Sequence, residues 1–184
     1  MSAIVTPFDG VKGGVKIYHS HYTDSHEDLC RLFKLRDKGE LARVEFKPDS
    51  QNAQDYAEPE KYKLKIDEER TPEWFDAEKQ EFVAEIMRGW VKSMIIDGEV
   101  DLLCGGAYIL KEGAKINTVG VCVIKVICGG TISDIRGGTI SDIRGGTISA
   151  ISGGTISVIC GGTISAIWGD ADVKKDHREN KQTR

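Results

Sequence analysis

Residues 129–168 read GGTISDIR, GGTISDIR, GGTISAIS, GGTISVIC and GGTISAIW, which are five copies of one eight-residue unit. The repeat extends toward the N-terminus in degenerate form as KINTVGVC and VIKVICGG, from Lys115. Self-similarity at a fixed period is typical of a solenoid, in which each unit buries its apolar face only against its neighbours. Two apolar ladders run through the repeat: Ile116, Ile124, Ile132, Ile140, Ile148, Ile156 and Ile164, and Val119, Ile127, Ile135, Ile143, Ile151, Ile159 and Ile167.

The order of residues within one unit predicts a short strand and a corner. In Thr-Ile-Ser, strand alternation points the isoleucine inward and both hydroxyls outward. A bend before the second isoleucine brings that side chain inside as well, and the Gly-Gly pair supplies the other corner. Two units per coil would give a 16-residue turn and three and a half coils, whereas three units would give a triangular 24-residue turn. We favour the 16-residue turn.

The remaining sequence predicts an α+β N-terminal cap domain over residues 1–104, the β-solenoid over 105–170 and a charged, disordered tail over 171–184. Alternation predicts strands over 15–23, 41–47 and 61–67, with a polar, mobile loop over 48–60. Ser25 and Asp28 resemble a capping box that opens a short helix ending near Gly39. Thr71-Pro72 predicts the start of a longer helix that reaches about Ile96. We expect its apolar stripe to contain Phe75, Phe82, Ile86, Trp90 and Met94.

Composition argues against several classes of protein. The net charge is -4 and the pI is about 5.6, whereas nucleic-acid binders usually carry a basic excess. No apolar run is long enough to span a bilayer, and the first residues, MSAIVTPFDG, do not resemble a secretory signal. The five cysteines form no CxxC pair, so we expect reduced thiols in a cytoplasmic protein.

The sequence offers few candidates for catalysis or metal binding. His19, His21, His26 and Cys30 lie close together and could bind zinc, but their spacing matches no standard site, so a surface strand with a helix cap is the other explanation. No nucleophile elbow and no phosphate-binding loop occur. We therefore predict a protein without a cofactor that is not an enzyme. A pocket built from His19, His21 and nearby acids remains an alternative.

Several exposed positions are candidates for contact with a protein partner. The long helix carries Glu78, Glu81 and Glu85, which form either a solvated face or a surface for a basic partner. The variable outward positions of the repeat provide Arg136, Arg144 and Trp168, and the 48–60 loop is a further candidate. Trp168 either anchors a partner or folds over the last coil as a plug, because tryptophan and arginine dominate interface hot spots.

The octad GGTISxIx, with the lead-in CGGAYILKEGAKINTV, resembles the small repeat-containing β-solenoid proteins of bacteria and phages. The resemblance covers residues 105–170, implies an intracellular, non-enzymatic protein and carries no functional residues across. Small phage proteins of this kind often bind host proteins.

Three hypotheses about function follow. The first is a non-catalytic protein-binding module, for instance an inhibitor of a bacterial host or defence protein that a phage or mobile element encodes. The second is self-assembly, as a homodimer or a longer polymer, through an open solenoid end. The third is ice binding by the Thr-Ile-Ser hydroxyls, which a 16-residue coil would divide into arrays of two or three units on two faces.

Overall fold

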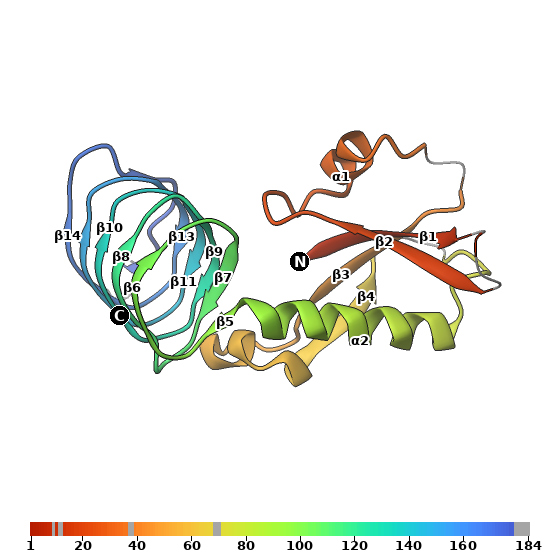
Figure 1. Ribbon diagram of the computed structural model, residues 1–184, viewed down its shortest axis with the longest axis horizontal. Helices are drawn as coiled ribbons and strands as arrows, with labels where there is room; N and C mark the ends of the chain where they lie inside the picture. Colours follow the sequence, from red (N-terminus) through yellow and green to blue (C-terminus); the bar gives the residue numbers. More distant parts are fainter. Residues whose placement is uncertain (9, 11–12, 37–38, 68–70, 179–184) are drawn as a thin grey trace. The chain divides into compact units, whose positions relative to one another are not determined.

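The computed structural model describes residues 1–8, 10, 13–36, 39–67 and 71–178, which form two compact units. The first unit contains Met1–Ser50 and Pro59–Trp90. The second contains Gln51–Glu58 and the chain from Val91 onward. As the sequence predicts, an α+β domain is followed by a β-solenoid, which has about five turns (Figure 1).

The first unit is built on a four-stranded antiparallel sheet with the strand order β2-β1-β3-β4. The predicted strands correspond to β2 (Gly14–His19), β3 (Ala42–Pro48) and β4 (Tyr62–Ile66). The sequence did not predict β1 (Ser2–Phe8), an interior strand that pairs with both β2 and β3. Its residues Ala3, Ile4 and Val5 are all fully buried, so β1 lacks the alternation by which the other strands were recognised.

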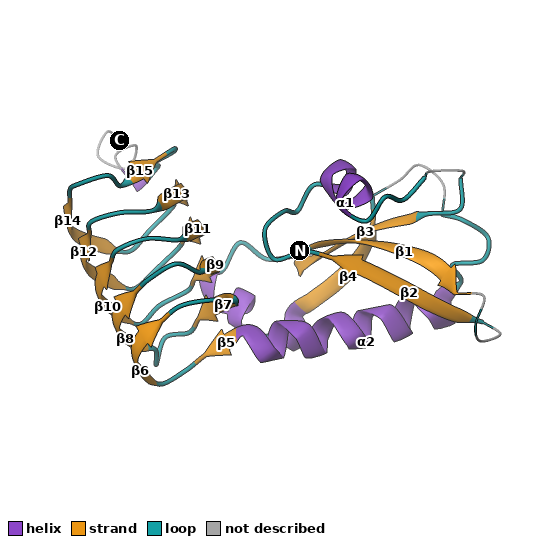
Figure 2. Ribbon diagram, turned by 45° about the horizontal axis from the view of Figure 1, so that its top comes forward, coloured by secondary structure: helices purple, strands orange, loops and turns teal. Residues whose placement is uncertain are grey.

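Two helices lie on opposite sides of this sheet (Figures 1 and 2). The first, α1 (His26–Leu32), begins as predicted, because the Ser25 hydroxyl accepts a hydrogen bond of 3.2 Å from the Asp28 amide. It ends at Leu32, well before Gly39. Its residue Leu29 packs with Ile4 and Leu41 in a small buried cluster.

The long helix, α2 (Ala77–Met94), begins later than predicted. Asp76, not Thr71, is placed to cap it, since its carboxylate accepts a 3.0 Å hydrogen bond from the Lys79 amide. The predicted apolar stripe is also partly wrong, because Phe82 is 52% exposed. The side chains buried along the helix are Val83, Ala84, Met87, Val91 and Met94.

The solenoid consists of two parallel sheets whose strands alternate along the chain (Figure 2). We name them the even sheet and the odd sheet after their strand numbers. The even sheet contains β6 (Glu99–Leu103), β8 (Lys115–Val119), β10 (Thr131–Ile135), β12 (Thr147–Ile151) and β14 (Thr163–Ile167). The odd sheet contains β5 (Ile95–Ile96), β7 (Ala107–Leu110), β9 (Val123–Ile127), β11 (Thr139–Ile143), β13 (Thr155–Ile159) and β15 (Asp172–Val173).

The pairing register sets the size of the coil. Thr131 pairs with Thr147, and Thr147 pairs with Thr163, so one coil contains 16 residues. This confirms the turn of two units. The stack is longer than the predicted three and a half coils, because β5, β6 and β7 extend both sheets toward the N-terminus, although their residues depart from the octad consensus.

In the four octads over residues 129–160, both isoleucines point into the coil and form one continuous core. Ile135, Ile143 and Ile151 are fully buried, and burying such a side chain contributes about 1.5–3 kcal/mol. The Gly-Gly corner is required by close packing as well as by backbone conformation. A Cβ at Gly145 would lie 2.3 Å from the Cys128 carbonyl oxygen, and Gly146 has a φ of +85°.

The predicted disordered tail is in part ordered. Asp172 and Val173 form β15, which pairs in parallel with β13, and the chain continues along β13 as far as His177. Ala171 and Val173 pack against the core. The sequence did not predict this strand, because the charged residues on both sides of Val173 are typical of a disordered tail. Residues 179–184 of the predicted tail lie outside the described residues.

We expect a protein that lacks residues 145–160 to fold with one coil less. After this deletion β14 still belongs to the even sheet, and it can pair with β10 in the register in which it now pairs with β12. Deletion of residues 145–156 is the control, since it breaks both isoleucine ladders. Circular dichroism during denaturant unfolding should show a cooperative transition only for the first variant. Equal behaviour of the two would contradict the coil register.

We expect Ile135→Ala to lower the free energy of unfolding by about 2–5 kcal/mol, because Ile135 is fully buried between two rungs. Ile167→Ala in the same ladder should lower it by less than about 1 kcal/mol, since Ile167 is 42% exposed. Urea unfolding followed by circular dichroism measures both values. A similar loss for both variants would mean that the last coil is as closely packed as the middle of the stack.

Candidate protein-interaction surface

The C-terminal strand of the even sheet, β14, lacks the features that usually prevent an edge strand from pairing with another chain. In the described part of the chain β14 pairs only with β12, so its outer edge has no neighbouring strand. Ile167 is 42% exposed and Trp168 is 56% exposed, whereas Ile135 and Ile151 in the same ladder are buried. Natural edge strands usually carry charges, prolines or bulges that prevent pairing with other chains, and the sequence TISAI has no charge and no proline. We call Thr163–Trp168 the end face.

The odd sheet is closed at the same end by the chain itself. The amides of Asp172, Lys174 and His177 donate hydrogen bonds of 2.8–2.9 Å to the carbonyl oxygens of Gly154, Ile156 and Ile159, and the Ile159 amide donates to the Lys175 carbonyl. Asp172 also forms an ion pair with Lys174. Within the described residues, the odd sheet thus ends in a charged strand, and the even sheet ends in the neutral end face.

Trp168 is placed better for contact with a partner than for plugging the coil. Its amide donates to the Ile151 carbonyl at 2.9 Å, which fixes the backbone, while the side chain stays mostly exposed. The residues that follow it, Ala171 and Val173, pack against the core in its place. The sequence singled out Trp168 but missed Ile164 and Ile167, although the last unit of any ladder lacks one neighbour.

Arg136 lies on the surface of the even sheet with 65% of its side chain exposed, and it pairs with Asp134 at 2.6 Å. This hydrogen bond holds the pKa of Asp134 below its usual value. The Ser152 hydroxyl donates to the other oxygen of Asp134 at 3.0 Å and so links neighbouring rungs. Arg136 thus balances the charge of Asp134 and stays accessible.

Arg144 points outward from the odd sheet but is covered by residues 51–58 of the same unit. Its guanidinium lies 4.2 Å from the centre of the Tyr56 ring and donates to the Gln51 carbonyl at 3.3 Å. Only 18% of the side chain is exposed, and its partner Asp142 is 17% exposed. Arg144 therefore binds the protein's own chain and is a poor candidate for contact with a partner.

The polar loop predicted over residues 48–60 is organised by these contacts. It forms two short 3-10 helices, η1 (Ala53–Ala57) and η2 (Pro59–Lys61). The Asn52 side chain caps η1, and the Gln54 side chain donates to the Cys128 carbonyl at 3.5 Å. No local sequence signal indicates this packing, because it depends on residues far along the chain.

Glu78, Glu81 and Glu85 lie on the exposed side of α2, as expected for a solvated face. Glu81 pairs with Arg88 at 2.9 Å, which reduces the negative charge of this surface. These glutamates belong to the first unit, and the end face belongs to the second. The structure thus offers two separate candidate surfaces.

The histidines do not form one cluster. The His19 ring stacks on Trp90 at 3.9 Å between ring centres and lies 5.2 Å from the His21 ring. The ring nitrogens of His26 lie 3.2 Å from the Val44 carbonyl and 3.2 Å from the Asp67 carboxylate. In the ranges that the structure describes, no three His, Cys, Asp or Glu side chains are placed to hold a metal ion.

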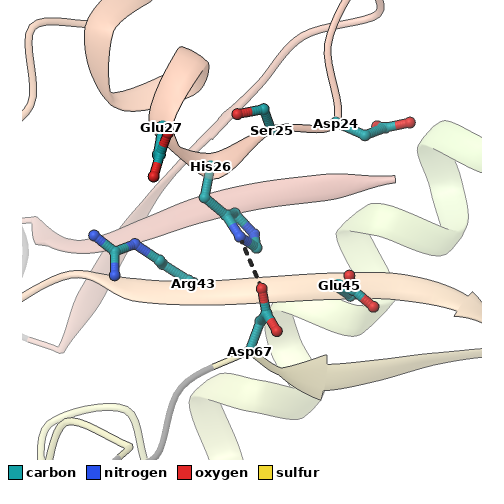
Figure 3. A pocket seen from close by; sticks show the side chains of 7 residues that line it. All are labelled: Asp24, Ser25, His26, Glu27, Arg43, Glu45 and Asp67. Atoms are coloured by element: carbon teal, nitrogen blue, oxygen red, sulfur yellow. Dashed lines mark ion pairs between the residues drawn. The ribbon is translucent and has the colours of Figure 1, made fainter.

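A polar hollow of about 410 Å³ lies beside His26 (Figure 3). His26 and Asp67, which are in contact at 3.2 Å, both line it, as does Ser25, which caps α1. Hydrogen bonding to Lys47 lowers the pKa of Glu45. Ser25 and His26 already interact with other groups of the protein: Ser25 with the Asp28 amide, and His26 with the Val44 carbonyl and the Asp67 carboxylate. Its lining residues are Asp24, Ser25, His26, Glu27, Arg43, Glu45 and Asp67.

Two of the thiols are poor nucleophiles. Burial raises the pKa of Cys122 to about 11 and that of Cys128 to about 12, so both are protonated at neutral pH. Cys104 and Cys160 are exposed.

The hydroxyl arrays have the size that the sequence predicts for a 16-residue coil. Thr131, Thr147 and Thr163 form three rungs on the even sheet, and Thr139 and Thr155 form two on the odd sheet. The next rung of the even sheet carries Lys115, which pairs with Glu99 at 2.7 Å. Charged side chains thus end the array after three rungs.

Comparison with known proteins identifies no relative: no protein-family model, no curated protein and no solved structure matches the chain. None of the helices in the described ranges has the length and apolar character needed to cross a membrane.

We expect Arg144→Gln to increase amide hydrogen exchange in residues 51–58, because it removes the stacking on Tyr56 and the bond to Gln51. Arg136→Gln is a matched control, since Arg136 occupies the same place in an identical octad but remains exposed. Exchange measured by mass spectrometry should rise only in the first variant. An equal rise in both would show that Arg144 does not hold the segment.

Proposed function

We propose that this protein is a non-catalytic protein-binding module that contacts its partner through the end face, Thr163–Trp168. The observation that carries the proposal is the difference between the two sheets at the same end of the stack. The chain covers the odd sheet with its own charged strand, whereas no described residue pairs with the outer edge of the even sheet, where Ile167 and Trp168 are exposed.

The chemistry of the end face favours a protein partner. An open strand edge offers backbone donors and acceptors, which another polypeptide satisfies best. Tryptophan provides a large apolar contact with a polar tip and is enriched in interface hot spots. The strand itself is neutral, which matches the depletion of charged residues at the centre of interfaces.

The state of the potentially reactive groups supports a role without catalysis. Ser25 caps a helix, His26 faces Val44 and Asp67, and burial suppresses ionisation of Cys128. Inhibition of a bacterial host or defence protein, encoded by a phage or mobile element, would be one use of such a module and stays a prediction. The face with Glu78, Glu81 and Glu85 stays a second candidate surface.

The test places a photo-crosslinking amino acid, benzoylphenylalanine, at position 168 of the full chain. Val121 is the control position, because it is 81% exposed and lies at a corner of the same solenoid, between β8 and β9. Irradiation in an extract of the cells that encode the protein should give an adduct of one defined mass from position 168 and none from position 121.

Competition makes this test specific. Excess unlabelled protein should abolish the adduct, whereas the Ile167→Lys variant should compete poorly, because it places a charge on the exposed apolar edge. The same adducts from both positions, or no protein adduct from position 168, would rule out the end face as the binding surface.

A further inference from the structure

We infer that the partner of the end face binds by adding an extended strand to the outer edge of β14. The inference rests on the proposed function, since it specifies how a protein would use that surface. The segment it requires has two apolar residues three positions apart, separated by two small or polar residues.

The structure contains a template for this kind of binding. Asp172–His177 lies outside the octad repeat, yet it pairs in parallel with the outer edge of β13. It does so through the carbonyl groups of Gly154, Ile156 and Ile159 and through the Ile159 amide. A segment of unrelated sequence can therefore dock on this end of the stack by main-chain hydrogen bonds, with Ala171 and Val173 packed against the core.

The same atoms recur on β14 one octad later. They are the carbonyl groups of Gly162, Ile164 and Ile167 and the Ile167 amide, on the strand edge that has no neighbour in the described residues. Gly162 and Ile167 are exposed and Ile164 is partly exposed, so an approaching chain can reach them. β14 thus presents a second copy of the docking edge that β13 already uses.

The side chains of the end face define which segment fits. Ile164 pairs with Ile148 and Ile167 pairs with Ile151, so the next strand must place apolar side chains over Ile164 and Ile167. Between these two isoleucine pairs, Ala150 pairs with Ala166, so the corresponding position of the added strand has room for a small residue. The required pattern is therefore that of the octad itself: apolar, two small or polar residues, then apolar.

Two other occupants fit less well. The last six residues, Glu179–Arg184, read ENKQTR and contain no apolar side chain for either position. A second copy of the solenoid, facing this one end to end, would meet β15 before β14, because β15 follows β14 in the coil and carries charges on both sides of Val173. A single extended strand can reach β14 without displacing β15.

The test uses the full chain with a flexible Gly-Ser linker and one added segment, GGTISAIS, at its C-terminus. This segment copies residues 145–152, which contain β12, the strand that stacks on the inner edge of β14. The linker raises the effective concentration of the segment, so that even weak docking can be measured. We expect the Ile167 amide to exchange at least about tenfold more slowly than in the unmodified chain.

The matched control carries the same linker and the segment GGTNSANS, in which asparagine replaces both isoleucines. Equal exchange at Ile167 in the two fusions would overturn the inference. The remaining occupant is a second copy of the chain, and native mass spectrometry shows whether the unmodified chain forms dimers. Protection of the Ile167 amide only under conditions in which these dimers form would assign the edge to a second copy and would also overturn the inference. A specific adduct from position 168 without isoleucine-dependent protection would keep the proposed function and reject strand addition.

Discussion

Each strand of the solenoid is held by the strands directly above and below it, and the whole stack depends on this nearest-neighbour packing. Ile135 is buried because Val119 and Ile151 flank it at the same register position. Ile167 belongs to the same ladder, yet it is 42% exposed, because Ile151 is its one ladder neighbour among the described residues. A stack of this kind therefore has two ends at which a strand lacks one neighbour, and the residues that cover each end determine which groups are exposed there.

The repeat could be predicted because its period encodes local and long-range structure together. Each octad specifies its own strand, and its identity to the next octad specifies the pairing partner. The first unit was predicted less well, because its elements depend on unlike neighbours. Thr71-Pro72 and Asp76 are both acceptable starts for a helix, and only the folded chain shows that α2 begins after Asp76.

The candidate surface shows where local reasoning ends. Arg136 and Arg144 occupy the same place in two identical octads, so no local pattern can distinguish them. One is exposed and the other lies under Tyr56, a residue that is distant in sequence. The sequence singled out Trp168 as a candidate contact residue, but it did not predict the strand at Asp172, because the charges around that strand resemble those of a disordered tail.

The assignment of residues 51–58 to the solenoid unit has a consequence for the genetic modularity of the protein. The chain passes from one unit to the other between Ser50 and Gln51, between Glu58 and Pro59, and between Trp90 and Val91. A gene fragment that starts at Val91 would therefore encode an incomplete solenoid, without the segment that stacks on Arg144. Removal of 16 residues within the repeat preserves the register of the stack, whereas a single exchange at Val91 separates the octads from the segment that covers Arg144.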